Sequence, residues 1–291
     1  MNINYNIYEN QVDKIPVTET AIVAFIDILG FKELIKEYDN GINQNLLKDI
    51  ISSMNTAVDF LKMNINNEPD FLNWKKKLKL KLFSDCLCAS IPAKFDFYNF
   101  EENLFYFMLY LSTYQNLLIE KGIFVRGGIS IGSFYSDDNI IFSGALVKAV
   151  ELEKRAKFPR IVIDKDLIVK LRNNQHFFNY FICEDNTNEY FINNFNHYDI
   201  ESNIINNNLD LISKTNLNFI KRNEEIIEKI KEFEKNQYNQ DIEKYSEIIK
   251  YQIDKCQFCQ QYLEKYKWQL DFLNWNIDKN NNNYSFKFNS I

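Results

Sequence analysis

Residues 21–31 read AIVAFIDILGF, and this stretch decides the fold. An uninterrupted apolar run that ends in a single acid, Asp27, is typical of a buried central strand. Gly30 follows at once and predicts a turn. Apolar residues then recur with helical spacing over residues 43–62, which predicts an amphipathic helix. The stretch therefore begins a strand–turn–helix unit.

A hairpin is predicted next along the chain. Residues 78–83 read LKLKLF and alternate as a half-buried strand does. Residues 86–92, CLCASIP, form a second apolar run after a short turn that contains Asp85. We therefore expect Asp85 at the tip of two antiparallel strands.

Helices and strands continue to alternate beyond the hairpin. The pattern predicts a helix at 100–120, a strand at 124–132, a helix at 145–157 and a strand at 160–164. This order describes an α+β sheet, close to a ferredoxin-like split βαβ arrangement, with helices packed on one face. Glycines inside the strand at 124–132 weaken it, and we expect them to allow close approach of a ligand or another chain.

Three regions differ in composition. We expect one α+β domain over residues 18–200. Residues 215–278 are charged and helical in period, which predicts a C-terminal helical extension packed on that domain. Residues 279–291 are rich in asparagine, and we expect a disordered tail.

Charge and composition exclude several classes of protein. The 291 residues carry a formal net charge of -6, whereas general binders of nucleic acid or anionic membranes have basic surfaces. No apolar run is long enough to span a membrane, and the polar N-terminal segment resembles no secretion signal. Five cysteines, an odd number, suit a reducing compartment. We therefore expect a cytoplasmic protein that binds neither nucleic acid nor membranes.

Two acids are the candidate metal ligands. Asp27 alone is explained by a helix cap, and Asp85 alone by a turn. Neighbouring antiparallel strands, however, can bring both carboxylates to one edge of the sheet. Paired carboxylates bind Mg²⁺ or Mn²⁺, and two such ions stabilise both oxygens of a phosphoryl displacement. We expect two divalent cations on Asp27 and Asp85, with the Ile28 carbonyl as a possible further ligand.

The turn after Asp27 is the candidate phosphate site. Leu29, Gly30 and Phe31 lead directly into a helix. Free backbone N–H groups at such a helix start bind phosphate well. The alternative is an ordinary strand–helix turn.

Four segments resemble the motifs of class III nucleotide cyclases. They are FIDILGF at 25–31, KLFSD at 81–85, VRGGISIG at 125–132 and SGALVKAVELEKRAKFPRIVI at 143–163. The resemblance covers residues 21–163, about half of the chain. It implies a cyclase-type fold, conversion of a nucleoside triphosphate to a 3′,5′-cyclic monophosphate and pyrophosphate, and a homodimer with two shared active sites. It also places Lys81 at the position of the base-reading lysine.

The chain departs from the purine cyclases at three positions. Ile141, Lys148 and Leu152 stand where those enzymes carry a base-reading Asp and the Asn and Arg that serve the transition state. Lys148 or Arg155 are the candidates to replace the missing group, and solvated helix charges are the alternative. Arg126 is the candidate phosphate-binding arginine, and a surface ion pair is the alternative.

These departures resemble a particular branch of the family. R-G-G-I at 126–129, A-x-x-L-E at 149–153 and P-R-I-V at 159–162 are similar to the pyrimidine cyclases of bacterial Pycsar anti-phage systems. That resemblance implies UTP ahead of CTP as substrate and a cyclic pyrimidine nucleotide that signals to a separate effector. A purine cyclase with a rewired pocket and a silent cyclase-like module remain as alternatives.

Overall fold

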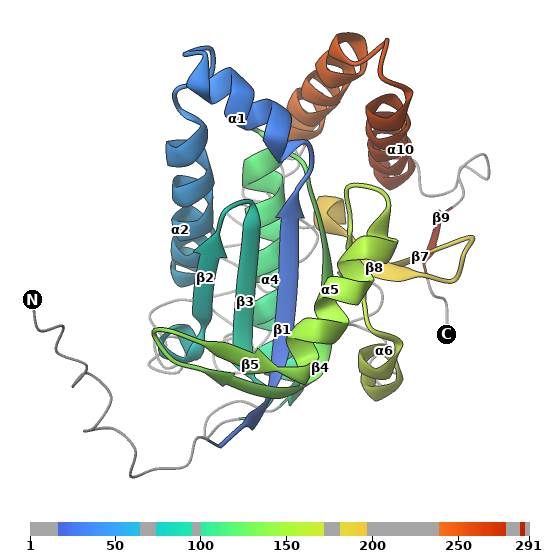
Figure 1. The fold of residues 1–291 in the computed structure, drawn as a ribbon. Coiled ribbons are helices and arrows are strands. Elements are labelled where there is room, and N and C mark those ends of the chain that lie inside the picture. The colour runs from blue at the N-terminus through green and yellow to red at the C-terminus, as the bar shows by residue number, and fades with distance from the viewer. Residues whose placement is uncertain are drawn as a thin grey trace, which may run out of the picture.

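The computed structural model describes residues 17–64, 74–94, 100–171, 181–196, 239–277 and 286–288. Within these ranges, every helix is too short or too polar to cross a membrane. The elements in Figure 1 are β1 (Glu19–Ile28), α1 (Phe31–Asp39), α2 (Leu46–Asn64), β2 (Lys79–Phe83), β3 (Cys86–Pro92), α4 (Phe100–Ile119), β4 (Val125–Ser136), β5 (Ile141–Ser143), α5 (Gly144–Ala156), β6 (Ile161–Ile163), α6 (Lys165–Leu171), β7 (Ile182–Asp185), β8 (Tyr190–Ile192), a 3₁₀ turn (Asn194–Asn196), α10 (Gln260–Ile277) and β9 (Phe286–Phe288).

The sheet has the strand order β2-β3-β1-β4-β6-β8-β7-β9, and β5 pairs with β4. β1 lies between β3 and β4 and is antiparallel to both, while β2 is antiparallel to β3. α1 and α2 connect β1 to β2, and α4 connects β3 to β4. This is the ferredoxin-like βαββαβ order. The predicted α+β fold class is confirmed.

Helices cover both faces of the sheet. Ile22, Ala24 and Ile26 of β1 pack into the core that α2 and α4 complete, whereas Ala21 and Val23 pack with α5. Figure 1 shows α4 behind the sheet and α5 in front of it. The expectation of helices on one face is therefore wrong. The reason lies in the apolar run itself, because a strand with apolar residues at consecutive positions is buried on both faces.

The glycines of β4 allow a close approach, but of the protein's own helix. A Cβ on Gly128 would lie 2.3 Å from the Ala149 carbonyl oxygen and 2.4 Å from Leu152 Cβ of α5. Gly132 faces the start of the same helix, where a Cβ would lie 3.3 Å from the Ala145 nitrogen. The expectation that a ligand or another chain approaches these glycines is wrong, since α5 occupies the space.

The C-terminal segment packs on the sheet domain. Residues 239–255 are helical, as is α10. Their buried side chains form one cluster with Leu29, Phe124 and Phe191. The expected extension begins at residue 215, and its first part, like residues 197–200, lies outside the described residues.

Part of the expected tail joins the sheet. β9 pairs antiparallel with β7, with Lys287 opposite Glu184. The expectation of disorder is therefore wrong for residues 286–288, and the rest of 279–291 lies outside the described residues. The Phe-Lys-Phe alternation is the period of a strand, and β7 offers an edge for it to pair with.

A buried arginine fixes α10 to the sheet. Arg160 is ion-paired with Asp185, and both are almost fully buried. The guanidinium carbon lies 5.8, 5.1 and 5.6 Å from the ring centroids of Phe158, Phe191 and Trp268. Trp268 belongs to α10 and stacks on Phe158 with 5.1 Å between ring centroids. These cation–π contacts tie one face of α10 to β6 and β8.

Candidate active site

One row of side chains crosses four strands on the face that carries α5. Asp27 of β1 is opposite Cys86 of β3 and Arg126 of β4, and Cys86 is opposite Phe83 of β2. Directly opposite residues share a face of an antiparallel sheet. The next row contains Lys81, Cys88, Phe25 and Gly128. The row with Asp27 lies at the end of β1, where the chain leaves the sheet.

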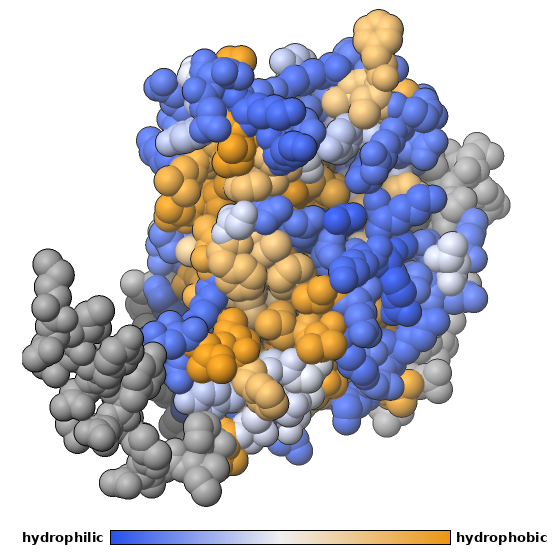
Figure 2. Space-filling model, viewed as in Figure 1, coloured by the Kyte–Doolittle hydropathy of each residue, from blue (hydrophilic) through white to orange (hydrophobic). Residues whose placement is uncertain are grey.

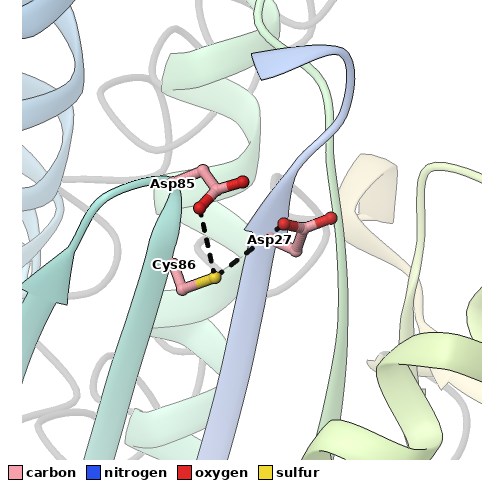
Figure 3. Close-up of side chains that lie close together, drawn as sticks. All are labelled: Asp27, Asp85 and Cys86. Carbon is pink, nitrogen blue, oxygen red and sulfur yellow. Dashed lines mark hydrogen bonds between the residues drawn. The ribbon is translucent and has the colours of Figure 1, made fainter. Parts of the chain in front are cut away.

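The hairpin turn brings Asp85 to Asp27. Ser84 and Asp85 form the two-residue loop between β2 and β3, and Ser84 adopts φ 57°. The Ile28 amide donates to the Asp85 carbonyl over 3.1 Å, which docks this loop against β1. Ligand atoms of Asp27, Asp85 and Cys86 then all lie within 4.8 Å of one another (Figure 3). The structure brings the two acids together; their role as metal ligands, and that of the Ile28 carbonyl, stay predictions.

Cys86 lies between the two carboxylates. Its sulfur is 3.8 Å from Asp27 Oδ1 and 3.6 Å from Asp85 Oδ1. Burial raises the pKa of the Cys86 thiol to about 12, and both carboxylates act in the same direction. The thiol is therefore a neutral hydrogen-bond donor to the acids. Cys86 was not among the site residues predicted from the sequence, although its place opposite Asp27 in an antiparallel pair was a usable signal.

The electrostatics of Asp27 favour a bound cation. Burial raises the pKa of the Asp27 carboxyl, Arg126 opposes this, and the neighbouring Asp85 raises it further, so that it stands above its ordinary value. Two carboxylates that repel each other in a partly buried site gain from a divalent cation between them. Their oxygen donors match the ligand preference of Mg²⁺ and Mn²⁺. The residues present therefore fit the expected metal.

Arg126 is held by two acids. Its Nε donates to Asp27 Oδ2 over 3.1 Å and lies 2.5 Å from Glu153 Oε1. Glu153 belongs to α5 and is only 4% exposed; burial raises the pKa of its carboxyl, and Arg126 opposes that rise. Glu153 was not among the site residues predicted from the sequence, but its spacing from the buried Ala149 and Ala156 places it on the inner face of the helix. Arg126 is thus positioned beside Asp27, and its role toward phosphate stays a prediction.

The expected phosphate turn is built around Gly30. Leu29 is buried, and its amide donates to the Phe124 carbonyl over 2.8 Å. Gly30 caps α1 in the left-handed conformation, φ 71°, and supplies no capping side chain. In the first turn of α1, the Glu33 amide donates to the Gly30 carbonyl over 3.0 Å, whereas the amides of Phe31 and Lys32 have no acceptor inside the helix. Such a helix start offers donors and a partial positive charge to an anion.

The remaining candidates contact groups other than the two acids. Lys81 donates to the Asp137 carbonyl in the β4–β5 turn. Lys148 Nζ lies 3.1 Å from Asp164 and 2.6 Å from Asp166. Arg155 pairs with Glu189 at 3.9 Å. Contributions from Lys81, Lys148 or Arg155 to a shared site therefore stay predictions that depend on a second chain.

Comparison with known proteins finds only weak similarity to solved structures, and those structures are of nucleotide cyclases. The sequence matches no protein-family model and has no significant match among curated proteins. Among solved structures, the adenylyl cyclase CyaB from P. aeruginosa matches with 14% identity and a TM-score of 0.43, covering 62% of this chain and 96% of that chain. The monomeric guanylyl cyclase domain of the RhoGC fusion protein from the aquatic fungus Blastocladiella emersonii matches with 13% identity and a TM-score of 0.41, covering 62% and 98%.

A third match is the adenylate/guanylate cyclase/hydrolase from Silicibacter pomeroyi, with 17% identity, a TM-score of 0.37 and coverage of 60% of this chain and 95% of that chain. All these identities and TM-scores are low. Assignment of an activity to this chain therefore depends on its own residues and on the four motifs that they form.

Proposed function

We propose that this chain is a nucleotide cyclase that converts a nucleoside triphosphate to a 3′,5′-cyclic monophosphate and pyrophosphate. The observation that carries the proposal is the convergence of Asp27 and Asp85, from two strands, beside the open start of α1. In the reaction the 3′-hydroxyl oxygen bonds to the α-phosphorus, and the bond from that phosphorus to pyrophosphate breaks.

Each group has a distinct part in this proposal. Asp27 and Asp85 hold two divalent cations, with the Ile28 carbonyl as a further ligand. When bound, these ions neutralise the phosphates and favour ionisation of the attacking hydroxyl. Gly30 and Phe31 present backbone donors to the phosphate chain, while Leu29, whose amide is bonded to the Phe124 carbonyl, fixes the turn that positions them. Arg126 orients Asp27 through its hydrogen bond and adds positive charge beside the phosphates.

A pyrimidine base, with UTP ahead of CTP, is the proposed substrate specificity. Its main support is the resemblance to pyrimidine cyclases. Ile141 stands in place of a base-reading acid, and its side chain cannot hydrogen-bond to the edge of a purine. A base whose polar groups find no hydrogen-bond partner in the site is bound poorly. Phe25 and Phe83 lie 6.4 Å apart between ring centroids on the site face, and Phe83 is exposed. Aromatic rings of this kind can stack on a base of any type.

A homodimer with two shared sites is the proposed assembly. Figure 2 shows apolar side chains gathered over β2, β3 and β1, on the face that carries the acids. Phe83, Phe142 and Val147 are among the exposed large apolar residues. Contiguous apolar patches of this kind mark interaction surfaces. A second chain on this face would bring Lys81 and Lys148 to the acids of the first.

The product is proposed to act as a second messenger in bacterial anti-phage defence, read by a separate cyclic-nucleotide effector. This part of the proposal rests on the resemblance alone.

One observation favours a second candidate function. Asp27 Oδ2 already accepts a hydrogen bond from Arg126, as it would in a purely structural ion pair. A silent dimerisation module would keep that pair and bind no metal.

Incubation with each of the four nucleoside triphosphates and Mn²⁺, followed by mass identification of products, tests the proposal. We expect cyclic UMP as the main product and none from Asp27→Asn. Cyclic AMP or cyclic GMP as the main product would overturn the base assignment. Absence of any cyclic product from the purified wild-type dimer would favour the silent module.

A further inference from the structure

The C-terminal helix carries an ammonium group to the candidate active site. Lys265 lies one turn after Tyr262 on α10, and its Nζ is 5.4 Å from the centroid of the Tyr262 ring. Residues three apart on a helix are neighbours on one face. The position of Tyr262 therefore decides where the Lys265 ammonium group stands.

Tyr262 packs against the phosphate turn. Its Cε1 lies 3.6 Å from the place where a Cβ would stand on Gly30. Its hydroxyl donates to Glu33 Oε2, in the first turn of α1, over 3.2 Å. A second tie joins Lys255 Nζ to Glu37 Oε1 of α1 at 2.6 Å. The C-terminal helices and α1 thus meet at the end of the sheet where β1 ends (Figure 1).

Two further contacts, one on each side of Lys265, fix the rotation of α10. Tyr266 is buried, with its ring centroid 4.9 Å from that of Phe124. Trp268 is held by the Arg160 contacts described above. Since these contacts flank Lys265 on both sides, rotation of the helix that would move Lys265 away from the site edge would break them.

Lys265 makes no ion pair with any of the described residues. The side chain is half-buried, and in the described part of the chain no carboxylate lies within ion-pair distance of it. Burial lowers the pKa of the Lys265 ammonium group, Arg126 lowers it further, and Asp27 opposes the change. A partly buried cation beside another cation is unfavourable unless an anion joins them.

We propose that Lys265 is a substrate-binding residue that contacts the phosphate chain of the nucleoside triphosphate, with Tyr262 as its positioning residue. The inference rests on the proposed function, because the substrate supplies the missing anion. A lysine ammonium is a compact point charge on a flexible stem, which suits a phosphate chain that changes its charge during the reaction. α10 then completes the phosphate site from within the same chain.

Binding measured by calorimetry in the presence of Mn²⁺ tests this role, with inorganic tripolyphosphate and UTP as separate probes. We expect Lys265→Met to weaken binding of both probes by about tenfold or more, the size of one charge-assisted hydrogen bond. Lys265→Arg keeps the charge and should stay within about threefold of wild type. Lys267→Met is the matched control, since Lys267 is exposed on the same helix, and should bind like wild type.

The outcomes separate this inference from the proposed function. If Lys265→Met weakens tripolyphosphate binding but wild type forms no cyclic product, the phosphate contact stands and the cyclase proposal fails. If wild type cyclises UTP and Lys265→Met has the same affinity and the same KM, the cyclase proposal stands and the role of Lys265 is overturned. Failure of wild type to bind either probe overturns both. Equal melting temperatures of the variants exclude a folding defect as the cause of a loss.

Discussion

Replacing Gly128 by alanine should push α5 away from the sheet. The new Cβ would lie 2.3 Å from the Ala149 carbonyl oxygen and 2.4 Å from Leu152 Cβ. Carbon atoms pack at about 3.5–4.0 Å, so the helix must retreat by roughly 1 Å. Two of the three clashing atoms belong to the helix backbone, and a change of rotamer cannot relieve them.

The expected destabilisation is about 3 kcal/mol, the upper end of the usual range for an overpacked core. Gly132→Ala is the matched control on the same strand and facing the same helix, because its Cβ would meet its nearest atom at 3.3 Å. We expect a change below about 1 kcal/mol there. The loss of unfolded-state entropy on replacing glycine is similar for both variants and cancels in the comparison.

Urea unfolding of wild type and the two variants measures these values. A difference of about 2 kcal/mol or more between the variants is expected. Turnover should fall in Gly128→Ala as well, since α5 carries Glu153, which holds Arg126 beside Asp27. Equal stability of the two alanine variants would refute the claim that α5 is packed against the bare backbone of β4.

Four further predictions concern the site and the buried ion pair. Asp27→Asn and Asp85→Asn should each lower turnover roughly a hundredfold or more with an unchanged fold, and near-normal rates in either would refute the metal assignment. Cys86→Ser should keep Mn²⁺-dependent turnover within about threefold, because a hydroxyl replaces a neutral thiol donor; a loss as large as that of Asp27→Asn would show that sulfur binds the metal. Mixing Asp27→Asn with Lys148→Met protein should restore activity if two chains share each site, whereas mixing two Asp27 variants should not. Burial raises the pKa of the Asp185 carboxyl, but its hydrogen bonds and its guanidinium partner hold it below its ordinary value of 3.8. Its ionised form therefore stabilises the fold fully above pH 3.8 and loses this contribution as pH falls below that value and through the lower pKa of the folded state, so the stability deficit of Asp185→Asn in urea unfolding should shrink in acid.

The part of the fold that could be predicted is local in sequence. The apolar run before Asp27 and the alternation of residues 78–83 gave the central strand and the hairpin, and the strand pairing follows from their order. The two faces of β1 were misjudged, although an apolar residue at every position already required cover on both sides.

The part of the site that could not be predicted depends on contacts between distant segments. Asp27 and Asp85 were found because each stands at the end of a strand. Glu153 was not predicted as a site residue, because the helical period shows which face of α5 is apolar but does not show which group a polar side chain at the border of that face will contact. Tyr262 is more than two hundred residues from the Gly30 turn that it contacts, and Lys265 lies beside Tyr262 on the same helix. The periodicity of neighbouring residues cannot predict this contact, because it forms only when α10 packs against α1.

The Arg160 guanidinium lies among the rings of Phe158, Phe191 and Trp268. These contacts make α10 unfold cooperatively with the sheet. If α10 detached alone, Arg160 would remain ion-paired with Asp185 but would lose its contact with the Trp268 ring. Water would then reach the apolar surface between the sheet and the helix. Partial opening is therefore disfavoured relative to complete unfolding, and the C-terminal helix should resist proteolysis as long as the sheet does. We therefore expect a chain truncated before residue 260 to show no cooperative melting transition, because the sheet would not remain folded without α10.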